Sequence, residues 1–478
     1  MRGDAVSGHV SQRVRFKQGH AESMTYASAE GRGVTVGLLF LGRKRPGFDM
    51  EWGRQMQQRV RRQLGQMELD VFEPREQAVD DASIRQAIAE CEEHGVDALV
   101  LLQTTMADGR LAPTAAQLWP DPLVLWATPE KPEGDMVSSC SLVGTHVWAS
   151  TLKRLGHSFE IVSGDPDEAG TRQHVIEAVR LAATVRRLRR LRVGLIGGQA
   201  PGFLAMNADP FALHQSLGAQ LQTYSLLEFA GVVESLPTEA VEEDVAVVKR
   251  MNLPHKDTTD EDLPMASRLY LAMRHYFDEE HLDALAVRCW PEMPNTYGQW
   301  PYLGMARLAD EGRAIACEGD VDGALCAWIG ESLGMGRCYL SDWLEHDDQT
   351  MTLWHGGAAP LSLSPPPDQP GGPRIARHFN NKKPAVVEAT IKPNMPITIF
   401  RLWRCDGNCH LAACDGDTIQ PRRHLMGTQA LARLVDRNPS DWFDELCHRG
   451  MPHHVAVVPG HHSALLRRLA RMMHFVFS

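Results

Sequence analysis

The sequence has few cysteines and no long apolar run. Ten cysteines are spread through 478 residues, far below the density of disulfide-stapled secreted domains, so we expect reduced thiols and no disulfide framework. The longest apolar stretch, around Val34–Leu41, is far shorter than the ~20 residues that a membrane span needs. Residues 1–32 are polar without an apolar signal core and are expected to form a flexible leader. These absences predict a cytoplasmic protein with no membrane partner.

The sequence also has no long basic run apart from the short cluster Arg186–Arg192. Its formal net charge is −11, which argues against a nucleic-acid partner, because such partners are bound by concentrated Lys and Arg. Hydrophobic residues make up 43% and charged residues 23% of the chain, as in globular proteins with large cores. At about 150 residues per domain, the length predicts roughly three domains.

The hydrophobic pattern predicts two α/β domains followed by a smaller β-rich domain. Over 33–190, short apolar runs such as Ala98–Gln103 alternate with longer amphipathic stretches, which is typical of a flavodoxin-like parallel sheet with helices on its faces. The same alternation recurs over 191–355. A Pro/Gly-rich stretch then leads into alternating segments such as Ile397–Trp403, which predict a β-rich, barrel-like domain over 356–478.

Several common functional motifs are absent or incomplete. Neither the H-E-x-x-H motif of zinc proteases nor the G-x-S-x-G motif of serine hydrolases occurs. The stretch Gly197–Gly202 lacks the G-x-G-x-x-G spacing of a dinucleotide-binding loop, so we interpret it as a turn. Cys405, Cys409, His410 and Cys414 lack a standard zinc-ligand spacing, and the Asp-Gly-Asn between the first two predicts a hairpin turn.

Two carboxylates stand where short apolar strands are expected to end. Glu318 follows Ala314–Cys317, and Asp342 follows the next expected strand after one intervening helix. Strands joined by one crossover helix present their carboxyl ends at the same edge of a parallel sheet, where such folds bind ligands. This pattern predicts that both acids face one site. The alternative is local: Glu318 caps the helix that begins near Asp320, and Asp342 starts a turn.

Histidines near the C-terminus are candidates to complete a metal site. Four of them, His453, His454, His461 and His462, surround a short apolar segment that is expected to be a strand. Two carboxylates and an imidazole suit Mn²⁺ or another divalent ion with open positions for water or substrate. Most surface histidines have no such role, so the residue types by themselves leave the metal site open.

The order of domains, together with three short strings, resembles the L-fucose isomerase and arabinose isomerase superfamily. The strings are Cys317–Val321, Asp342 and His454–Gly460. The similarity covers most of the chain after residue 32 and is strongest from about Ala284 to Trp354 and again near His454. The spacing of the two acids is its most specific part.

This resemblance implies two flavodoxin/Rossmann-like domains, a C-terminal barrel and a Mn²⁺ ion held by Glu318, Asp342 and His454. It implies aldose–ketose isomerisation of an open-chain sugar through a cis-enediol, in which the ion polarises the carbonyl and Glu318 and Asp342 also serve as the acid/base pair. Which acid takes the C2 proton stays open. It also implies a homotrimer or homohexamer in which the first domain of one subunit closes the neighbour's site.

The walls of a sugar pocket need hydrogen-bonding groups and an aromatic floor. The candidate substrate-binding residues near strand ends or late loops are Arg43, Arg45, Trp126, Arg288, Trp290, Glu292, Trp354, His355 and His453. His453 stands where fucose isomerases have an asparagine that contacts sugar, and the chain is shorter than the long fucose isomerases.

Two substrate classes and two other classes of function remain open. An imidazole-rich or cationic pocket suits 6-deoxy-6-sulfo-glucose (sulfoquinovose), which enzymes similar to this superfamily convert to 6-deoxy-6-sulfofructose. The other substrate class is a neutral sugar such as L-fucose or D-arabinose. The alternative functions are a non-catalytic sugar-binding or regulatory protein of the same fold, and a metal-dependent hydrolase or lyase with similar ligands.

Overall fold

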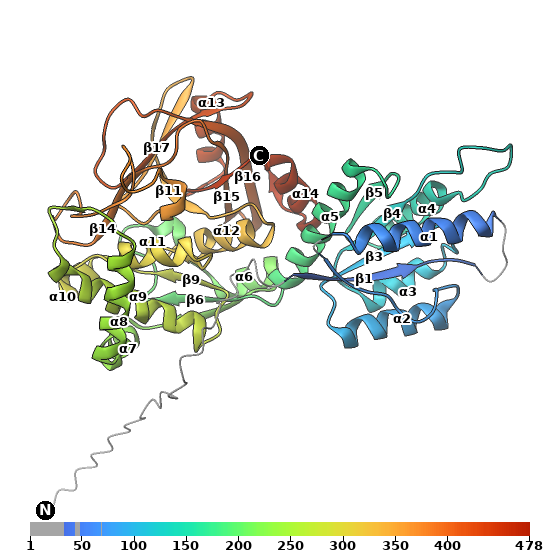
Figure 1. Cartoon of the computed structure of the whole chain (residues 1–478), viewed down its shortest axis with the longest axis horizontal. Helices are drawn as coiled ribbons and strands as arrows, with labels where there is room; N and C mark the ends of the chain where they lie inside the picture. The colour runs from blue at the N-terminus through green and yellow to red at the C-terminus, as the bar shows by residue number, and fades with distance from the viewer. Residues whose placement is uncertain (1–32, 44–47, 68) are drawn as a thin grey trace, which may run out of the picture.

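The computed structural model describes residues 33–43, 48–67 and 69–478 (Figure 1). The predicted leader over 1–32 and the candidate Arg45 lie outside the described residues. Within the described ranges the strands form two parallel sheets and a larger sheet that is mainly antiparallel. The predicted fold class, two α/β domains followed by a barrel-like domain, is confirmed.

The first domain is a parallel sheet with the strand order β2-β1-β3-β4-β5, the order of flavodoxin-like folds. All six residues of its central strand β3 are buried, because helices cover both faces of the sheet. Its elements are β1(Val34–Phe40), α1(Met50–Leu64), β2(Leu69–Phe72), α2(Asp81–His94), β3(Ala98–Gln103), α3(Leu111–Leu118), β4(Leu123–Ala127), α4(Ser141–Arg154), β5(Phe159–Ser163) and α5(Ala169–Leu188).

The second domain is a shorter parallel sheet with the order β10-β9-β6-β7. Its strands are β6(Arg192–Ile196), β7(Gln220–Tyr224), β9(Ala284–Val287) and β10(Ala314–Ala316). Its helical elements are η2(Leu204–Met206), α6(Pro210–Leu217), α7(Leu226–Ser235), α8(Thr238–Arg250), η3(Asp260–Asp262), α9(Leu263–Asp278), α10(Glu292–Tyr297), α11(Tyr302–Asp310) and α12(Val321–Ser332). Because α12 follows edge strand β10 directly, its N-terminus stands at the carboxyl edge of this sheet.

The third domain is a closed antiparallel barrel in the order β16-β15-β18-β11-β12-β17, and pairing of β16 with β17 completes the ring. Buried Trp343, Trp403 and Trp442 belong to its core. The barrel strands are β11(Tyr339–His346), β12(Thr350–His355), β15(Pro396–Cys405), β16(Asn408–Ile419), β17(Thr428–Leu434) and β18(His454–Pro459). The remaining elements are β8(His255–Lys256), η4(Leu361–Leu363), β13(Arg374–Ala376), β14(Val386–Thr390), α13(Pro439–His448), α14(Ser463–Met473) and β19(Val476–Phe477).

The predicted hairpin at Cys405 is confirmed. Strands β15 and β16 are joined by Asp406 and Gly407, which have φ of 51° and 73°, and Cys405 pairs with Asn408. A two-residue turn with both φ values positive matches the right-handed twist of the flanking strands. The Asp-Gly-Asn sequence therefore encodes this turn.

The placement of Asp342 differs from the prediction. Its strand β11 does not return to the second parallel sheet, whose edge is β10; it pairs antiparallel with β18 and β12 inside the barrel. The expectation that Glu318 and Asp342 end neighbouring strands of one parallel sheet was therefore wrong. The barrel strands also begin at Tyr339, inside the range 191–355 that was expected for the second domain. A strand–helix–strand pattern looks the same in sequence whether the second strand rejoins the sheet or starts a new one.

The C-terminal helix α14 connects the barrel to the first domain. It lies beside α5 near the centre of the molecule (Figure 1). Arg468 forms ion pairs with Glu160 at 2.9 Å and with Glu177 at 2.7 Å. None of the described helices combines the length and the apolarity needed to cross a membrane.

Candidate active site

Glu318 lies in a tight turn between β10 and α12. Its φ is 61°, and the φ of the next residue, Gly319, is 73°. A Cβ atom at Gly319 would lie 2.2 Å from the carbonyl oxygen of Gly198, so only glycine fits there. The backbone N–H of Ala200 donates to the Glu318 carbonyl at 2.8 Å. The glycine-rich stretch, interpreted as a plain turn, thus packs against the backbone that presents Glu318.

Asp342 and His454 come from the barrel wall. They are directly opposite residues on the antiparallel strands β11 and β18, so their side chains project from the same face of the sheet. His454 is completely buried, whereas the Asp342 side chain is 24% exposed. The barrel therefore presents an imidazole and a carboxylate side by side toward the Glu318 turn.

Four side chains converge between the turn and the barrel. His454 Nε2 lies 3.4 Å from Glu318 Oε2 and 3.5 Å from Asp342 Oδ1. His453 Nε2 lies 3.4 Å and 3.5 Å from the same two oxygens. Both Glu318 Oε2 and His454 Nε2 are buried without a hydrogen-bond partner. The structure thus brings the three predicted metal ligands together and adds His453 to them.

These atoms suit a divalent cation. An orphaned buried carboxylate oxygen beside an orphaned imidazole nitrogen is costly unless a ligand satisfies both. Ligand atoms of Glu318, His453 and His454 lie within 4.8 Å of one another, and Asp342 adds a second carboxylate. Oxygen and imidazole donors with open positions are typical of Mn²⁺ and similar ions.

A buried carboxylate orients the His454 ring. His454 Nδ1 lies 2.8 Å from Asp320 Oδ2, and the guanidinium of Arg401 donates to both oxygens of Asp320 at 2.7 and 2.8 Å. All three side chains are fully buried. Since Asp320 accepts the Nδ1–H, the lone pair of Nε2 points toward the carboxylates.

The charges of the buried carboxylates follow from these contacts. Burial raises the pKa of Glu318, but the imidazoles of His453 and His454, each 3.4 Å away, hold it well below its usual range. Burial likewise raises the pKa of Asp320, and the Arg401 guanidinium outweighs it and keeps this pKa far below normal. Both groups are therefore carboxylates at neutral pH.

Comparison with known proteins supports a family assignment. Residues 373–478 match the family model described as L-fucose isomerase, C-terminal domain. Sulfoquinovose isomerases from Alkalicoccus urumqiensis and Priestia aryabhattai are 28% and 26% identical over 379 and 381 residues, which is 79% of this chain and 84% of each relative. An L-arabinose isomerase from Bacillus subtilis (strain 168) is 20% identical over 218 residues, 44% of each chain. These matches make the chain similar to the L-fucose/arabinose isomerase superfamily over most of its length and support its placement there. Its class of activity is aldose–ketose isomerisation.

Two of the predicted sugar-binding residues lie at the carboxylates. Trp290 donates its indole N–H to Glu318 Oε1 at 2.8 Å. His453 is 39% exposed, and Phe203 packs at a tilt against its ring with centroids 4.6 Å apart. An aromatic surface and an imidazole therefore border the site on its open side.

Three other predicted sugar-binding residues, Arg288, Glu292 and Trp354, already bond to other groups of the protein. Arg288 and Glu292 form an ion pair with each other, so neither is a free charge. Trp354 lies opposite Asp342 on β12 and donates its indole N–H to the carbonyl of Met426 at 2.7 Å. The sequence pattern located these residues near strand ends but carried no information about their partners.

His355 lies behind the site and not in its wall. It is 3% exposed, and its Nε2 lies 3.0 Å from Cys317 Sγ. Its ring centroid is 6.0 Å from that of His454. Burial raises the pKa of Cys317, but the charges of His355 and His454 outweigh burial, so that the net shift is downward.

Two candidate sugar-binding residues, Arg43 and Trp126, belong to the first domain and to a different sheet from the residues of this site. Arg43 is exposed just after β1. Trp126 is completely buried within β4, and its indole N–H donates to the carbonyl of Gly164 at 3.3 Å. Trp126 is therefore a core residue and not a pocket residue, because β4 is covered on both faces.

The structure also adds residues that sequence reasoning missed. Asp320 was considered only as a helix start, and it does cap α12 by accepting the N–H of Gly323 at 2.9 Å. Arg401 and Cys317 had no assigned role. An arginine inside an otherwise apolar strand was the available signal, since a buried arginine requires a carboxylate.

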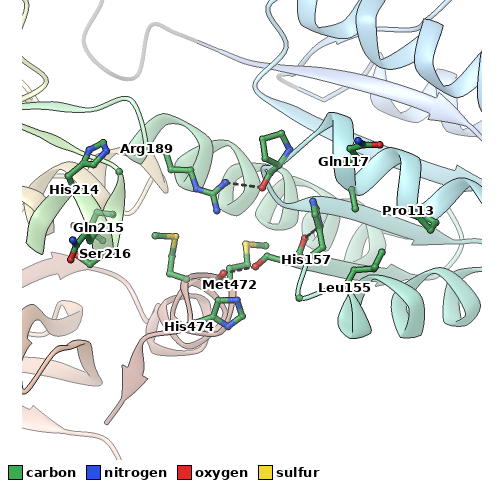
Figure 2. Close-up of a pocket in the computed structure, with 17 residues that line it drawn as sticks. Pro113, Gln117, Leu155, His157, Arg189, His214, Gln215, Ser216, Met472 and His474 are labelled. Atoms are coloured by element: carbon green, nitrogen blue, oxygen red, sulfur yellow. Dashed lines mark hydrogen bonds between the residues drawn. The ribbon is translucent and has the colours of Figure 1, made fainter. Parts of the chain in front are cut away.

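A cavity lies away from this site, elsewhere in the described part of the molecule. It has a volume of about 740 Å³ and is formed where the first domain, α6 and α14 meet (Figure 2). His157 Nε2 lies 2.8 Å from the Trp119 carbonyl, and Arg189 donates to the Pro120 carbonyl at 2.9 Å. These polar groups are already bonded to backbone, so the cavity is a domain junction without converging reactive groups.

Proposed function

We propose that this chain is a metal-dependent sulfoquinovose isomerase that converts 6-deoxy-6-sulfo-glucose to 6-deoxy-6-sulfofructose. The supporting observation is that His454 Nε2 lies 3.4 Å from Glu318 Oε2 and 3.5 Å from Asp342 Oδ1, and that both His454 Nε2 and Glu318 Oε2 are buried and unpartnered. We take the substrate from the names of two sulfoquinovose isomerases, which align with this chain over 84% of their own length.

Glu318, Asp342 and His454 would hold the ion, with His453 beside it. We propose Mn²⁺, while other divalent ions suit the same donors. When bound, such an ion polarises the sugar carbonyl and stabilises the oxyanion that develops as the C2 proton leaves. Asp320 and Arg401 contribute indirectly, because they keep the His454 lone pair directed at this position.

The two carboxylates are proposed to move the proton. One of them accepts the C2 proton of the open-chain aldose and returns it to C1 on the same face of a cis-enediol. Trp290 fixes the orientation of Glu318 through its other oxygen, while Asp342 is the more exposed of the pair. Both are positioned beside the open side of the site, where the C1–C2 end of a sugar must enter.

His453 supports an anionic sugar. It is half-exposed at the mouth of the site, and it offers an imidazole N–H where fucose isomerases offer an amide. This difference from the fucose isomerases agrees with the names of the relatives, which give a sulfonated sugar as their substrate. This favours sulfoquinovose over L-fucose or D-arabinose.

A substrate panel in deuterated water tests the function. Full-length protein is incubated with sulfoquinovose, L-fucose, D-arabinose or L-arabinose, with Mn²⁺ or with a chelator. The expected result is 6-deoxy-6-sulfofructose formed only with the metal, with deuterium at C1 in the molecules whose transferred proton exchanges with solvent before its return. Conversion of a neutral sugar alone would refute the substrate assignment. Cleavage products would indicate a hydrolase or lyase, and sugar binding without ketose would indicate a binding protein.

We further propose that the chain works in the cytoplasm as a homotrimer or homohexamer, with the first domain of one subunit closing the neighbour's site. All ten cysteines are free thiols, as is usual in a reducing compartment. The first domain exposes four apolar side chains, which are suited to burial against a neighbouring subunit. They are Met136, Val137, Leu142 and Val143. Light scattering after size-exclusion chromatography measures the mass, and a monomer of 53.1 kDa would contradict the proposal.

A further inference from the structure

A second set of metal-binding atoms lies directly behind the carboxylates. Cys317 Sγ, His355 Nε2 and a ring nitrogen of His454 lie within 4.8 Å of one another, and all three residues are buried. Cys317 Sγ is 3.0 Å from His355 Nε2. His454 Nε2, which faces this set and the carboxylates alike, has no hydrogen-bond partner. The set therefore contains an unsatisfied buried donor atom and a thiol.

We infer that Cys317, His355 and His454 form a second metal site, which takes a thiolate-preferring ion such as Zn²⁺ or Cd²⁺. Sulfur and imidazole donors select these ions, whereas the carboxylates in front suit harder ions. At ~2.3 Å for Zn–S and ~2.0–2.1 Å for Zn–N, tetrahedral ligand atoms are roughly 3.3–3.6 Å apart. The Cys317–His355 distance needs to open by only about half an ångström to match.

Binding there needs no oxidant or reductant. The ion forms a bond to Cys317 sulfur, and the thiol proton is released to solvent. His355 and His454 each contribute a nitrogen lone pair, and a water or a Glu318 oxygen completes four ligands. The His355 Nδ1 atom is buried without a partner, so no hydrogen bond of this nitrogen has to break when Nε2 binds the ion.

The two metal positions share His454. Its Nδ1–H is donated to Asp320, so Nε2 has the only lone pair available for a metal. One ion can use that lone pair at a time. A thiolate-bound ion therefore displaces the ion held by Glu318 and Asp342, which makes Zn²⁺-class ions inhibitors that excess Mn²⁺ relieves. This displacement rests on the proposed function, whereas the site itself does not.

Cadmium titration tests the site without using activity. Metal-free, full-length protein is titrated with Cd²⁺, and the thiolate-to-cadmium charge-transfer absorption is followed in the ultraviolet. We expect one strong site per chain in the native protein and in Cys338→Ser, which removes a buried thiol outside this cluster. Cys317→Ser should lose the signal, and circular dichroism shows whether it is folded. Any contribution from the exposed Cys447 is common to all variants.

A native signal no greater than that of folded Cys317→Ser would overturn the site. If Cys317→Ser does not fold, His355→Asn provides the second test: the charge-transfer band should remain while cadmium affinity falls roughly tenfold or more. Unchanged cadmium affinity in His355→Asn would also overturn the site, because His355 would then not be a ligand.

Competition tests the shared ligand. With Mn²⁺ at about ten times its own dissociation constant, the apparent cadmium affinity should fall about tenfold. Unchanged affinity would show that the two ions do not share His454. A cadmium site in a protein that isomerises no sugar would leave this inference intact and refute only the proposed function. Mn²⁺-dependent isomerisation without a cadmium site would refute this inference and leave the proposed function intact.

Discussion

Asp342 and His454 are cross-strand neighbours in the barrel wall, opposite each other on β11 and β18. Their functional atoms, Asp342 Oδ1 and His454 Nε2, lie 3.5 Å apart. Glu318 approaches both from the turn after β10 in the other domain. The candidate site thus exists only where the barrel meets the second parallel sheet, and its geometry depends on how these two domains pack.

Glu318→Gln should abolish metal binding and isomerisation. The change keeps the shape of the side chain but removes a charged ligand, and we expect isomerase activity to fall roughly 10²–10⁴-fold. Mn²⁺ content per chain should fall in parallel, measured by elemental analysis after gel filtration. Metal addition should raise the melting temperature of the native protein but not of the variant. A variant that retains stoichiometric Mn²⁺ would contradict the ligand assignment.

Asp320→Asn should weaken Mn²⁺ binding about 10–100-fold, because the carboxylate that orients a ligand histidine is lost. It also leaves Arg401 buried without a full charge partner, at a cost of about 3–5 kcal/mol in unfolding free energy. Isothermal titration measures the affinity, and denaturant unfolding measures the stability.

A matched control separates these two effects. Asp244 forms a buried, two-point ion pair with Arg307, at 2.7 Å for both hydrogen bonds, among residues that do not contact Glu318. Asp244→Asn should cost a similar unfolding free energy and leave Mn²⁺ affinity unchanged. Equal losses of affinity in both variants would show that Asp320 acts only through stability.

Trp290→Phe should lower kcat/KM about tenfold, since it removes a hydrogen bond to a charged carboxylate that is worth ~1.5 kcal/mol. The indole of Trp354 donates to a backbone carbonyl instead, so Trp354→Phe is the matched control with a smaller expected effect. Steady-state kinetics with sulfoquinovose provides the comparison. If both variants lose the same amount, the Trp290–Glu318 hydrogen bond has no special role.

Acid should loosen the loop of residues 130–140 in the first domain. Burial raises the pKa of Glu130, but hydrogen bonds from Ser138 and Ser139 lower it to about 2. A folded pKa below the unfolded value of about 4.3 gives stability that is present above the unfolded pKa and lost as the pH falls toward 2. The protection of this loop, measured as its hydrogen-exchange rate relative to the intrinsic rate at each pH, should therefore fall over that range, and Glu130→Gln should show low protection that does not depend on pH. A native loop whose protection does not change would refute this.

Local sequence patterns predict much of the fold. Continuous apolar runs such as Ala98–Gln103 predict strands buried on both faces, and the structure confirms this one. The Asp-Gly-Asn sequence predicts a hairpin because only certain residues tolerate its positive φ angles. Trp126 shows the limit of the same reasoning: its position in a buried strand of the first domain, and not its residue type, decides that it cannot contact a sugar.

Local patterns in the chain are enough to predict the order of the domains and to indicate Glu318, Asp342 and His454, because strand ends, turns and short family motifs are formed by neighbouring residues. The three-dimensional structure was needed to show that Asp342 belongs to the barrel, that Asp320 and Arg401 orient His454, and that Cys317 lies against His355. Strand pairing and buried ion pairs join residues far apart in the chain, Asp320 and Arg401 being separated by 81 positions. Such contacts are selected by packing of the whole chain, and no local pattern encodes them.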